Sequence, residues 1–286
     1  MDAAPRTFHH RDFPSERLAR RGLSLSVVVP ARECAATIGA IAGVLASMRE
    51  RGLIDQALVV DADSADGTAA LAAERGVEVL SENDLMEEFG PVRGKGDAMW
   101  RALAACRGDA VCYVDGDTAN FAEHFVAGTL GPLLFEPGVQ YVKAFFRRPF
   151  RSGEAVLPAD GGRVTELTAR PLLRRFWPEL AGVRQPLAGE MAARRDLLVR
   201  LPFSTGYAVE TALLLDVHRE VGAGAIAQVD LEERQNDHKA LLDLAPMADE
   251  VLAAASARLR REGRLAGDGA DEPLERPPMA SVRVAA

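Results

Sequence analysis

Short apolar runs alternate with segments of helical periodicity along the first half of the chain. The runs "LSLSVVVPA", "ALVVDADS", "VEVL" and "DAVCYVDGD" are rich in β-branched residues and predict four strands. Between the first two strands, Ile38, Ile41, Leu45 and Met48 recur at helical spacing. The segments "ADGTAALAAERG", which stops at Gly76, and "KGDAMWRALAACRG" predict two further helices. Apolar strands separated by helices are typical of a mostly parallel α/β sheet covered on both faces.

The second half of the chain has a different pattern. It contains a predicted strand, "VQYVKAFFRRPF", and then a loop rich in Gly, Pro and Ala. Helices are predicted in "RVTELTARPLLRRFWPEL" and from about Tyr207 onward, before the strand "AIAQVDL". We divide the chain into a polar N-terminal arm (1–22), a first half (23–150), a second half (151–262) and a flexible tail (263–286).

Composition and charge exclude several classes of protein. The 286 residues are 48% hydrophobic, yet no apolar run reaches the roughly 18 residues of a membrane span. The N-terminus has no apolar secretory segment, and the three cysteines follow no disulfide or zinc pattern, so we expect a cytoplasmic protein. The net charge of −8 argues against nucleic-acid binding. Anionic substrates would therefore need local cations or a bound metal.

Polar residues follow the predicted strands at their carboxyl ends. Pro30, Asp61, Asp63, Asp115 and Asp117 all occupy such positions. Open α/β sheets bind ligands along this edge. The sequence therefore places the candidate site there.

Asp115 and Asp117 form a short D-x-D motif around Gly116. Two close carboxylates ionise together only if a cation lies beside them, and Mg²⁺ bound with substrate phosphate is a common solution. A solvated turn is the alternative.

The turn "VVDADSADGT" is also acidic. Asp61 and Asp63 can accept hydrogen bonds from a ribose or a base. The alternative is helix capping by Ser64 or Asp66, and both roles can hold together.

Two glycine-rich segments precede predicted helices and are candidate anion sites. One is Gly94–Lys95–Gly96, where helix-end N–H groups and the lysine favour an anion. The other is "GGRVT", in which Arg163 can grip a phosphate or carboxylate bidentately and Thr165 adds a hydroxyl. A solvated lysine and a capping box at Thr165 are the respective alternatives.

Among the five histidines, His238 is the candidate metal ligand. It follows the strand "AIAQVDL" and is placed to reach the sheet edge, whereas His9 and His10 lie in the arm, and His124 and His218 lie on predicted helices. A structural role for any single histidine is the alternative.

Several motifs together resemble those of a known family. The segments "SVVVPARECAATIGAI", "VVDADSADGT", "RGKGDAMWRAL" and "YVDGDTAN" resemble the nucleotide-sugar domain of GT-A glycosyltransferases. The later segments "GGRVTELTARPLL", "QPLAGEMAARRDLL" and "PFSTGYAVETALLLD" resemble the glucosyl-3-phosphoglycerate synthase family, which includes related mannosyl-3-phosphoglycerate synthases. The resemblance implies a Rossmann-like GT-A sheet, with nucleotide-sugar binding by residues 23–150 and a C-terminal acceptor-binding subdomain within 151–262. It also implies a metal-dependent, retaining transfer of a hexose from a nucleoside diphosphate to 3-phosphoglycerate.

The resemblance assigns roles to individual residues. Donor binding falls to Pro30, Ala31, Glu33, Asp63, Lys95, Asp115 and Gly116. Asp117 corresponds to the ligand of Mg²⁺ or Mn²⁺, Leu187 to a residue whose backbone carbonyl faces the reacting sugar, and Glu210 to an acid near the sugar hydroxyls. Acceptor binding falls to Gly162, Arg163, Val164, Thr165 and Asn236. Asp117, Lys95, Leu187 and Glu210 are thereby the expected catalytic residues.

One segment departs from the family pattern. The family has His-x-Asn after the strand "AIAQV", whereas this chain has Asn236 and then His238. We favour His238 as the second metal ligand, because imidazole is the commoner one. Asn236 in the ligand position is the alternative.

Other functions are weighed against this one. A nucleotidylyltransferase or a dehydrogenase would have a glycine-rich loop after the first strand, where this chain has "PARECAAT". A non-catalytic sugar-nucleotide-binding protein stays open, as does GDP-mannose in place of the favoured UDP-glucose. We also expect a homodimer, with no membrane partner.

Overall fold

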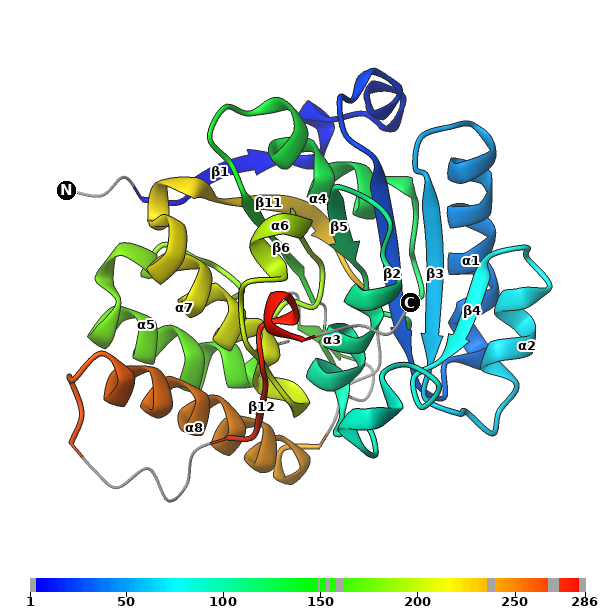
Figure 1. Cartoon of the computed structure of the whole chain (residues 1–286). Coiled ribbons are helices and arrows are strands. Elements are labelled where there is room, and N and C mark those ends of the chain that lie inside the picture. Colours follow the sequence, from blue (N-terminus) through cyan, green and yellow to red (C-terminus); the bar gives the residue numbers. More distant parts are fainter. Residues whose placement is uncertain are drawn as a thin grey trace.

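The computed structural model describes residues 4–148, 150–152, 155–157, 162–235, 240–266 and 273–282. Within them, an eight-stranded sheet forms the centre of the molecule, with strand order β1-β11-β6-β9-β5-β2-β3-β4 (Figure 1). Its strands are β1 (Arg6–His9), β2 (Leu25–Ala31), β3 (Gln56–Asp61), β4 (Glu78–Ser81), β5 (Ala110–Tyr113), β6 (Tyr141–Arg147), β9 (Met191–Arg194) and β11 (Ile226–Glu233). Neighbouring strands are parallel except at β9, which runs antiparallel to both β5 and β6. The predicted mostly parallel sheet is confirmed.

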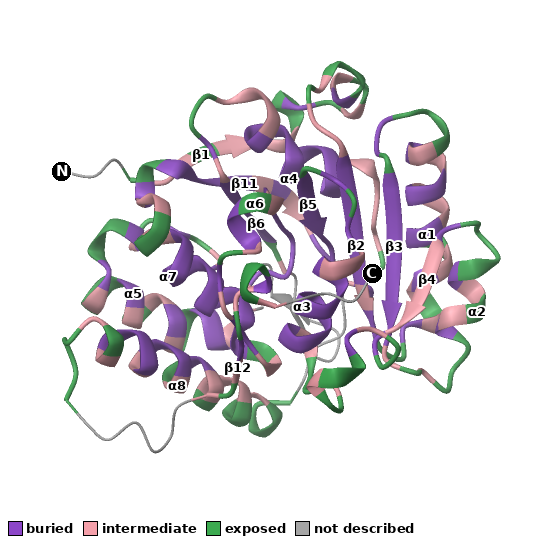
Figure 2. Cartoon of the chain, viewed as in Figure 1, coloured by how far each residue is buried: buried purple, intermediate pink, exposed green. Residues whose placement is uncertain are grey.

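Helices cover both faces of this sheet. Alternate residues of a strand point to opposite faces, so each strand contributes side chains to the cores on both sides. On β2, Val27 and Val29 belong to the core beneath α1 and α4, whereas Val28 belongs to the core beneath α3 and α7. All three valines are fully buried, and the inner strands are buried along most of their length, whereas the edge strands β1 and β4 are mostly of intermediate burial (Figure 2). The helices are α1 (Ala35–Glu50), α2 (Thr68–Ala73), α3 (Lys95–Ala105), α4 (Glu123–Phe135), α5 (Arg170–Phe176), α6 (Arg195–Leu198), α7 (Val209–Val221) and α8 (Ala245–Arg261). No helix in these described ranges is both long and apolar enough to cross a bilayer.

The N-terminal segment is part of the folded body and not a detached arm. β1 adds to the edge of the sheet by parallel pairing with β11. Phe13 and Leu18 are buried, and Gly131 on α4 leaves room for the Phe13 ring, since a Cβ there would lie 2.1 Å from it. The sequence pattern did not predict β1, because an edge strand buries only part of its surface and its residues can therefore be polar.

Residues 273–282, which belong to the predicted flexible tail, lie against the folded body. β12 (Glu275–Arg276) pairs antiparallel with β10 (Phe203–Ser204). The Arg276 guanidinium bonds both carboxylate oxygens of Asp97 on α3, at 2.8 and 2.6 Å. The Trp100 indole N–H donates to the carbonyl of Pro277 at 2.8 Å. These contacts fasten the C-terminal segment to α3.

The second half follows the predicted elements with local changes. The helix predicted from Arg163 contains one π-type segment (Thr165–Ala169), continues as α5 and ends before Trp177. α7 begins at Val209, after a 3-10 turn that contains Tyr207. β7 (Phe150–Ser152) pairs antiparallel with β8 (Ala155–Leu157). The strand β9 and the helix α8 are elements that the sequence pattern did not predict.

Candidate active site

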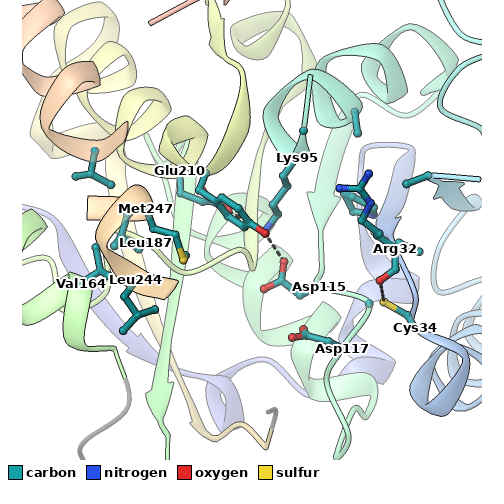
Figure 3. Close-up of a pocket in the computed structure, with 18 of the residues that line it drawn as sticks. Arg32, Cys34, Lys95, Asp115, Asp117, Val164, Leu187, Glu210, Leu244 and Met247 are labelled. Carbon is teal, nitrogen blue, oxygen red and sulfur yellow. Dashed lines mark hydrogen bonds and ion pairs between the residues drawn. The ribbon is translucent and has the colours of Figure 1, made fainter. Parts of the chain in front are cut away.

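The carboxyl ends of β2, β5, β6 and β11 border a pocket of about 510 Å³. This volume is typical of a small-molecule site, for which roughly 300–1,000 Å³ is usual. Its lining combines residues from both halves of the chain, as Figure 3 illustrates for Lys95 and Asp115 on one part and Leu187, Glu210 and Met247 on the other. The sequence-predicted residues in the lining are Pro30, Ala31, Lys95, Asp115, Gly116, Asp117, Gly162, Arg163, Val164, Thr165, Leu187 and Glu210.

Lys95 is the first residue of α3 and connects the two halves. Its Nζ lies 2.5 Å from Asp115 Oδ1 and 2.7 Å from Glu210 Oε1. Burial alone would lower the pKa of Lys95, but these two carboxylates raise it above its usual value. Gly96 lets the start of α3 pack against the Ser204 backbone, because a Cβ there would lie 1.9 Å from the carbonyl oxygen of Ser204. The lysine is therefore a fixed positive charge in the pocket.

Arg234 is a second cation of the pocket, and sequence reasoning missed it. It follows β11, its side chain is 1% exposed, and it lies 2.7 Å from Asp115 Oδ2 and 3.2 Å from Glu190 Oε1. Its other amino group bonds Asp117. The same argument that selected the acids, a polar residue at the carboxyl end of a parallel strand, would have selected Arg234.

The two acids of the D-x-D motif have different environments. Asp115 has a side chain 16% exposed, and although burial opposes ionisation, Lys95 and Arg234 hold its pKa below the usual range. Asp117 is 55% exposed and lines the pocket. Gly189 packs directly on Asp115, since a Cβ there would lie 2.1 Å from Oδ1. Asp115 is thereby a partly buried anchor, and Asp117 is the more accessible carboxylate.

Two further charged groups lie under the pocket. Glu190 is buried, and burial raises its pKa although Arg234 opposes the rise. Lys143 on β6 is also buried, and its Nζ donates to the carbonyl of Ala188. Burial lowers the pKa of Lys143 to about 8. β9 is antiparallel to its neighbours, so its amino end, where Glu190 lies, meets the carboxyl ends of the parallel strands. A search restricted to the carboxyl ends of strands therefore misses Glu190.

The pocket offers oxygen ligands that fit a divalent metal. Asp117 is exposed and carries a carboxylate, and Asp115 and Glu190 lie behind it. Carboxylate oxygens are the donors that Mg²⁺ and Mn²⁺ prefer. The two residues predicted to complete this set or to contact the acceptor, His238 and Asn236, lie outside the described residues.

Glu33 and Asp63 are not among the residues that line the pocket. Both have positive φ, at 50° and 53°. Glu33 accepts a hydrogen bond from the Ala65 N–H at 2.9 Å, and Asp63 accepts from Ser81 Oγ at 2.7 Å and from Asn83 Nδ2 at 2.6 Å. Their carboxylates therefore hold the turns beside the pocket, and the proposed nucleoside contacts of these two residues stay a prediction.

The other acids of this turn make local hydrogen bonds. Asp61 accepts from the Ser64 N–H at 2.9 Å, and Asp66 accepts from the N–H and the hydroxyl of Thr68. The N-cap of α2 is Gly67, which makes no side-chain capping bond, so neither Ser64 nor Asp66 occupies the capping position of the alternative.

The predicted acceptor segment lies on the far side of the pocket from β2. Gly162 has φ +88°, which favours glycine, and its carbonyl accepts from the Glu166 N–H at 3.0 Å. Thr165 makes no capping hydrogen bond, so the capping-box alternative is not realised among the described residues. Val164, Leu244 and Met247 add an apolar wall (Figure 3).

Comparison with known proteins gives consistent relatives. Residues 26–127 match the family described as Glycosyl transferase family 2. Glucosyl-3-phosphoglycerate synthase from Petrotoga mobilis is 40% identical over 267 residues, which is 91% of this chain and 82% of that protein.

Two solved structures are similar over nearly the whole chain. Mannosyl-3-phosphoglycerate synthase from Rubrobacter xylanophilus has a TM-score of 0.89 and 48% identity, covering 97% of both chains. Glucosyl-3-phosphoglycerate synthase from Mycobacterium tuberculosis, in complex with Mn²⁺, UDP and glucosyl-3-phosphoglycerate, has a TM-score of 0.84 and 38% identity, covering 98% of this chain and 100% of that one.

Proposed function

Because this chain belongs to the glucosyl-3-phosphoglycerate synthase family, we propose that it transfers glucose from UDP-glucose to 3-phosphoglycerate. The observation that carries this proposal is the single pocket in which Lys95 and the D-x-D motif face the Gly162–Thr165 segment. One cavity thus brings a candidate diphosphate site and a candidate acceptor site together. A transferase needs both substrates in contact.

The donor is proposed to lie along the carboxyl ends of β2 and β5. Pro30 and Ala31 line this part of the pocket, and Lys95 stands at the N-terminus of α3. A lysine and helix-end N–H groups stabilise a diphosphate as negative charge develops on it. Arg234 is placed to do the same, since its guanidinium lies in the pocket lining.

Asp117 would hold a divalent cation, with His238 as the favoured second ligand and Asn236 as the alternative. Bound Mg²⁺ or Mn²⁺ would neutralise charge on the departing diphosphate. For Asp117 to bind it, the carboxylate must share or give up its bond to Arg234.

The acceptor is proposed to lie against Gly162, Arg163, Val164 and Thr165. A guanidinium forks onto a phosphate or carboxylate, and the backbone N–H groups and the Thr165 hydroxyl can add hydrogen bonds. The net charge of −8 makes such a local cationic site necessary for a highly anionic acceptor.

The bond changes follow from these positions. The bond between the anomeric carbon and the diphosphate oxygen breaks, and the acceptor hydroxyl oxygen bonds to the same face of that carbon. The hydroxyl proton passes to an oxygen of the leaving diphosphate.

Glu210 is paired with Lys95 at 2.7 Å, which favours a role in holding Lys95 and the sugar over a role as covalent nucleophile. The backbone of Leu187 is proposed to face the reacting sugar. A glycosyl adduct trapped on Glu210 and seen by mass spectrometry would refute this scheme.

Mannosyl transfer from GDP-mannose is the second candidate, because the similar Rubrobacter xylanophilus structure is that of a mannosyl-3-phosphoglycerate synthase. Side-by-side turnover with UDP-glucose, GDP-glucose and GDP-mannose, each with 3-phosphoglycerate and Mg²⁺, separates the candidates. We expect the fastest release of nucleoside diphosphate from UDP-glucose. Fastest release from GDP-mannose would favour the second candidate, and release from none would favour a binding protein.

The chain is further proposed to act in the cytoplasm as a homodimer. Its three cysteines are free and buried, which suits a reducing compartment. Sedimentation equilibrium would test the dimer.

A further inference from the structure

A cluster of histidines joins the N-terminal edge of the sheet to the end of β11, away from the pocket described above. His9 ends β1, His10 begins the next 3-10 turn (His10–Asp12), and Glu232 lies near the end of β11. The Nε2 atoms of His9 and His10 lie 3.6 and 3.7 Å from the two carboxylate oxygens of Glu232. One donor atom from each residue lies within 4.8 Å of the other two.

We propose that His9, His10 and Glu232 form a binding site for a zinc ion. The site is separate from the proposed catalytic metal and does not rest on the proposed function. Two imidazole nitrogens and one carboxylate oxygen are a donor set that Zn²⁺ favours, usually with water as the fourth ligand.

The spacing of the donors fits this ion. Tetrahedral zinc with bonds of about 2.0–2.1 Å keeps its ligand atoms roughly 3.3–3.4 Å apart. The two measured separations run to different oxygens of Glu232 and exceed this by a few tenths of an ångström. Side-chain rotations that bring one oxygen of Glu232 within reach of both Nε2 atoms would close the site.

His10 is held in place for this role. Gly128 on α4 lets it approach, since a Cβ there would lie 2.7 Å from the Cβ of His10. The His124 ring packs against the His10 ring with centroids 4.6 Å apart. Nε2 of His10 is buried and has no hydrogen-bond partner among the described residues.

Two existing contacts compete with zinc, and both are weak. Arg11 lies 2.5 Å from Glu232 Oε1, but its side chain is 73% exposed, and exposed pairs of this kind contribute little. Nδ1 of His9 accepts a hydrogen bond from the Arg11 N–H at 3.2 Å, which places the ring proton on Nε2. Zinc binding therefore moves the Arg11 side chain to solvent and moves the His9 proton to Nδ1 at the expense of this bond.

A filled site would clamp β1 and the following turn onto β11. Glu232 precedes Arg234 by two residues, so the clamp would also brace the strand that delivers Arg234 to the pocket. Zinc is expected to raise the free energy of unfolding, because a ligand that binds only the folded chain shifts the equilibrium toward the folded state.

The first test is calorimetric titration of the full chain with ZnCl₂ in the Asp117→Ala background, which weakens the proposed catalytic metal site. One zinc site is expected, and His10→Gln or Glu232→Gln should weaken it at least about a hundredfold, since even outer-shell changes at metal sites cost 10- to 100-fold. His218→Ala, on α7, is the control and should bind zinc normally. Melting temperatures without zinc show whether each variant is folded. Equal zinc affinity in the folded His10→Gln and Glu232→Gln variants would overturn the proposal.

The second test uses a change in the opposite direction. Arg11→Gln removes the competing cation and should tighten zinc binding by about two- to fivefold, in line with the small value of an exposed pair. Unchanged or weaker binding in this variant would contradict the assigned geometry.

Discussion

Lys143 is 1% exposed on β6, and burial lowers the pKa of its ammonium group to about 8. Below pH 8, both the folded and the unfolded chain bind this proton. Between pH 8 and about 10.4, the folded chain has released it while the unfolded chain still holds it, so the free energy of unfolding rises with pH. Relative to Lys143→Met, wild type should gain roughly 3 kcal/mol across this window. Urea unfolding of both proteins at pH 7 and pH 10 measures the difference, and a relative loss by wild type would contradict the assignment.

Asp117→Ala should abolish metal-dependent turnover and leave the fold intact. The side chain is 55% exposed, so its removal costs the core little, and Arg234 keeps its contacts to Asp115 and Glu190. Nucleoside diphosphate release at saturating Mg²⁺, together with the melting temperature, checks both statements. Full activity would exclude Asp117 as a metal ligand.

Arg163→Ala should weaken acceptor binding about ten- to a hundredfold, because a charged hydrogen bond contributes roughly 1.5–3 kcal/mol. Donor binding measured without acceptor should barely change, since Pro30, Ala31 and Lys95 belong to the other half of the chain. The Arg163→Lys variant should keep only part of the acceptor affinity, because an ammonium group cannot form the guanidinium fork. A loss of donor affinity with unchanged acceptor affinity would reverse the two assignments.

The helix α3 depends on a segment far away in the chain. Asp97 in its first turn is fully buried and bonds Arg276, Arg101 and the Arg93 N–H. Arg276→Met would leave this carboxylate with fewer partners and should lower the free energy of unfolding by about 3 kcal/mol, as is usual for a broken buried pair. Turnover should fall as well, because α3 begins with Lys95.

The matched control is Arg107→Ala. Arg107 is 67% exposed and pairs with Glu78, so its loss should change stability by no more than about 0.5 kcal/mol. Thermal unfolding of both variants supplies the comparison. Equal, small effects would show that the C-terminal segment does not support α3.

The whole molecule is built on one sheet that the boundary at residue 150 does not divide. β9 lies between β5 and β6, and β11 separates β6 from β1. A fragment of residues 1–150 would expose the edges of β5 and β6 and should not fold, as judged by circular dichroism. The full chain should unfold in urea as one transition. A cooperatively folded fragment would contradict this view and support two independent halves.

The sequence by itself determined the strands and helices of the first half, the D-x-D motif, the glycine-rich segments and the family resemblance. These features are local, because burial on a strand or helix repeats with a short period and turn residues act within a few positions. The tertiary structure decided which distant charges meet. Arg234 pairs with Asp115 across 119 positions, and Arg276 pairs with Asp97 across 179.

Such pairs produce no periodic pattern in the sequence, because nothing near either partner in the chain indicates which distant charge it will contact after folding. The same holds for Glu190, whose position depends on β9 running against its neighbours, and for β1, whose polar sequence hides an edge strand. Local hydrophobic periodicity encodes which elements form. Long-range contacts between buried charges, stabilised only where solvent is excluded, decide how the pocket is assembled.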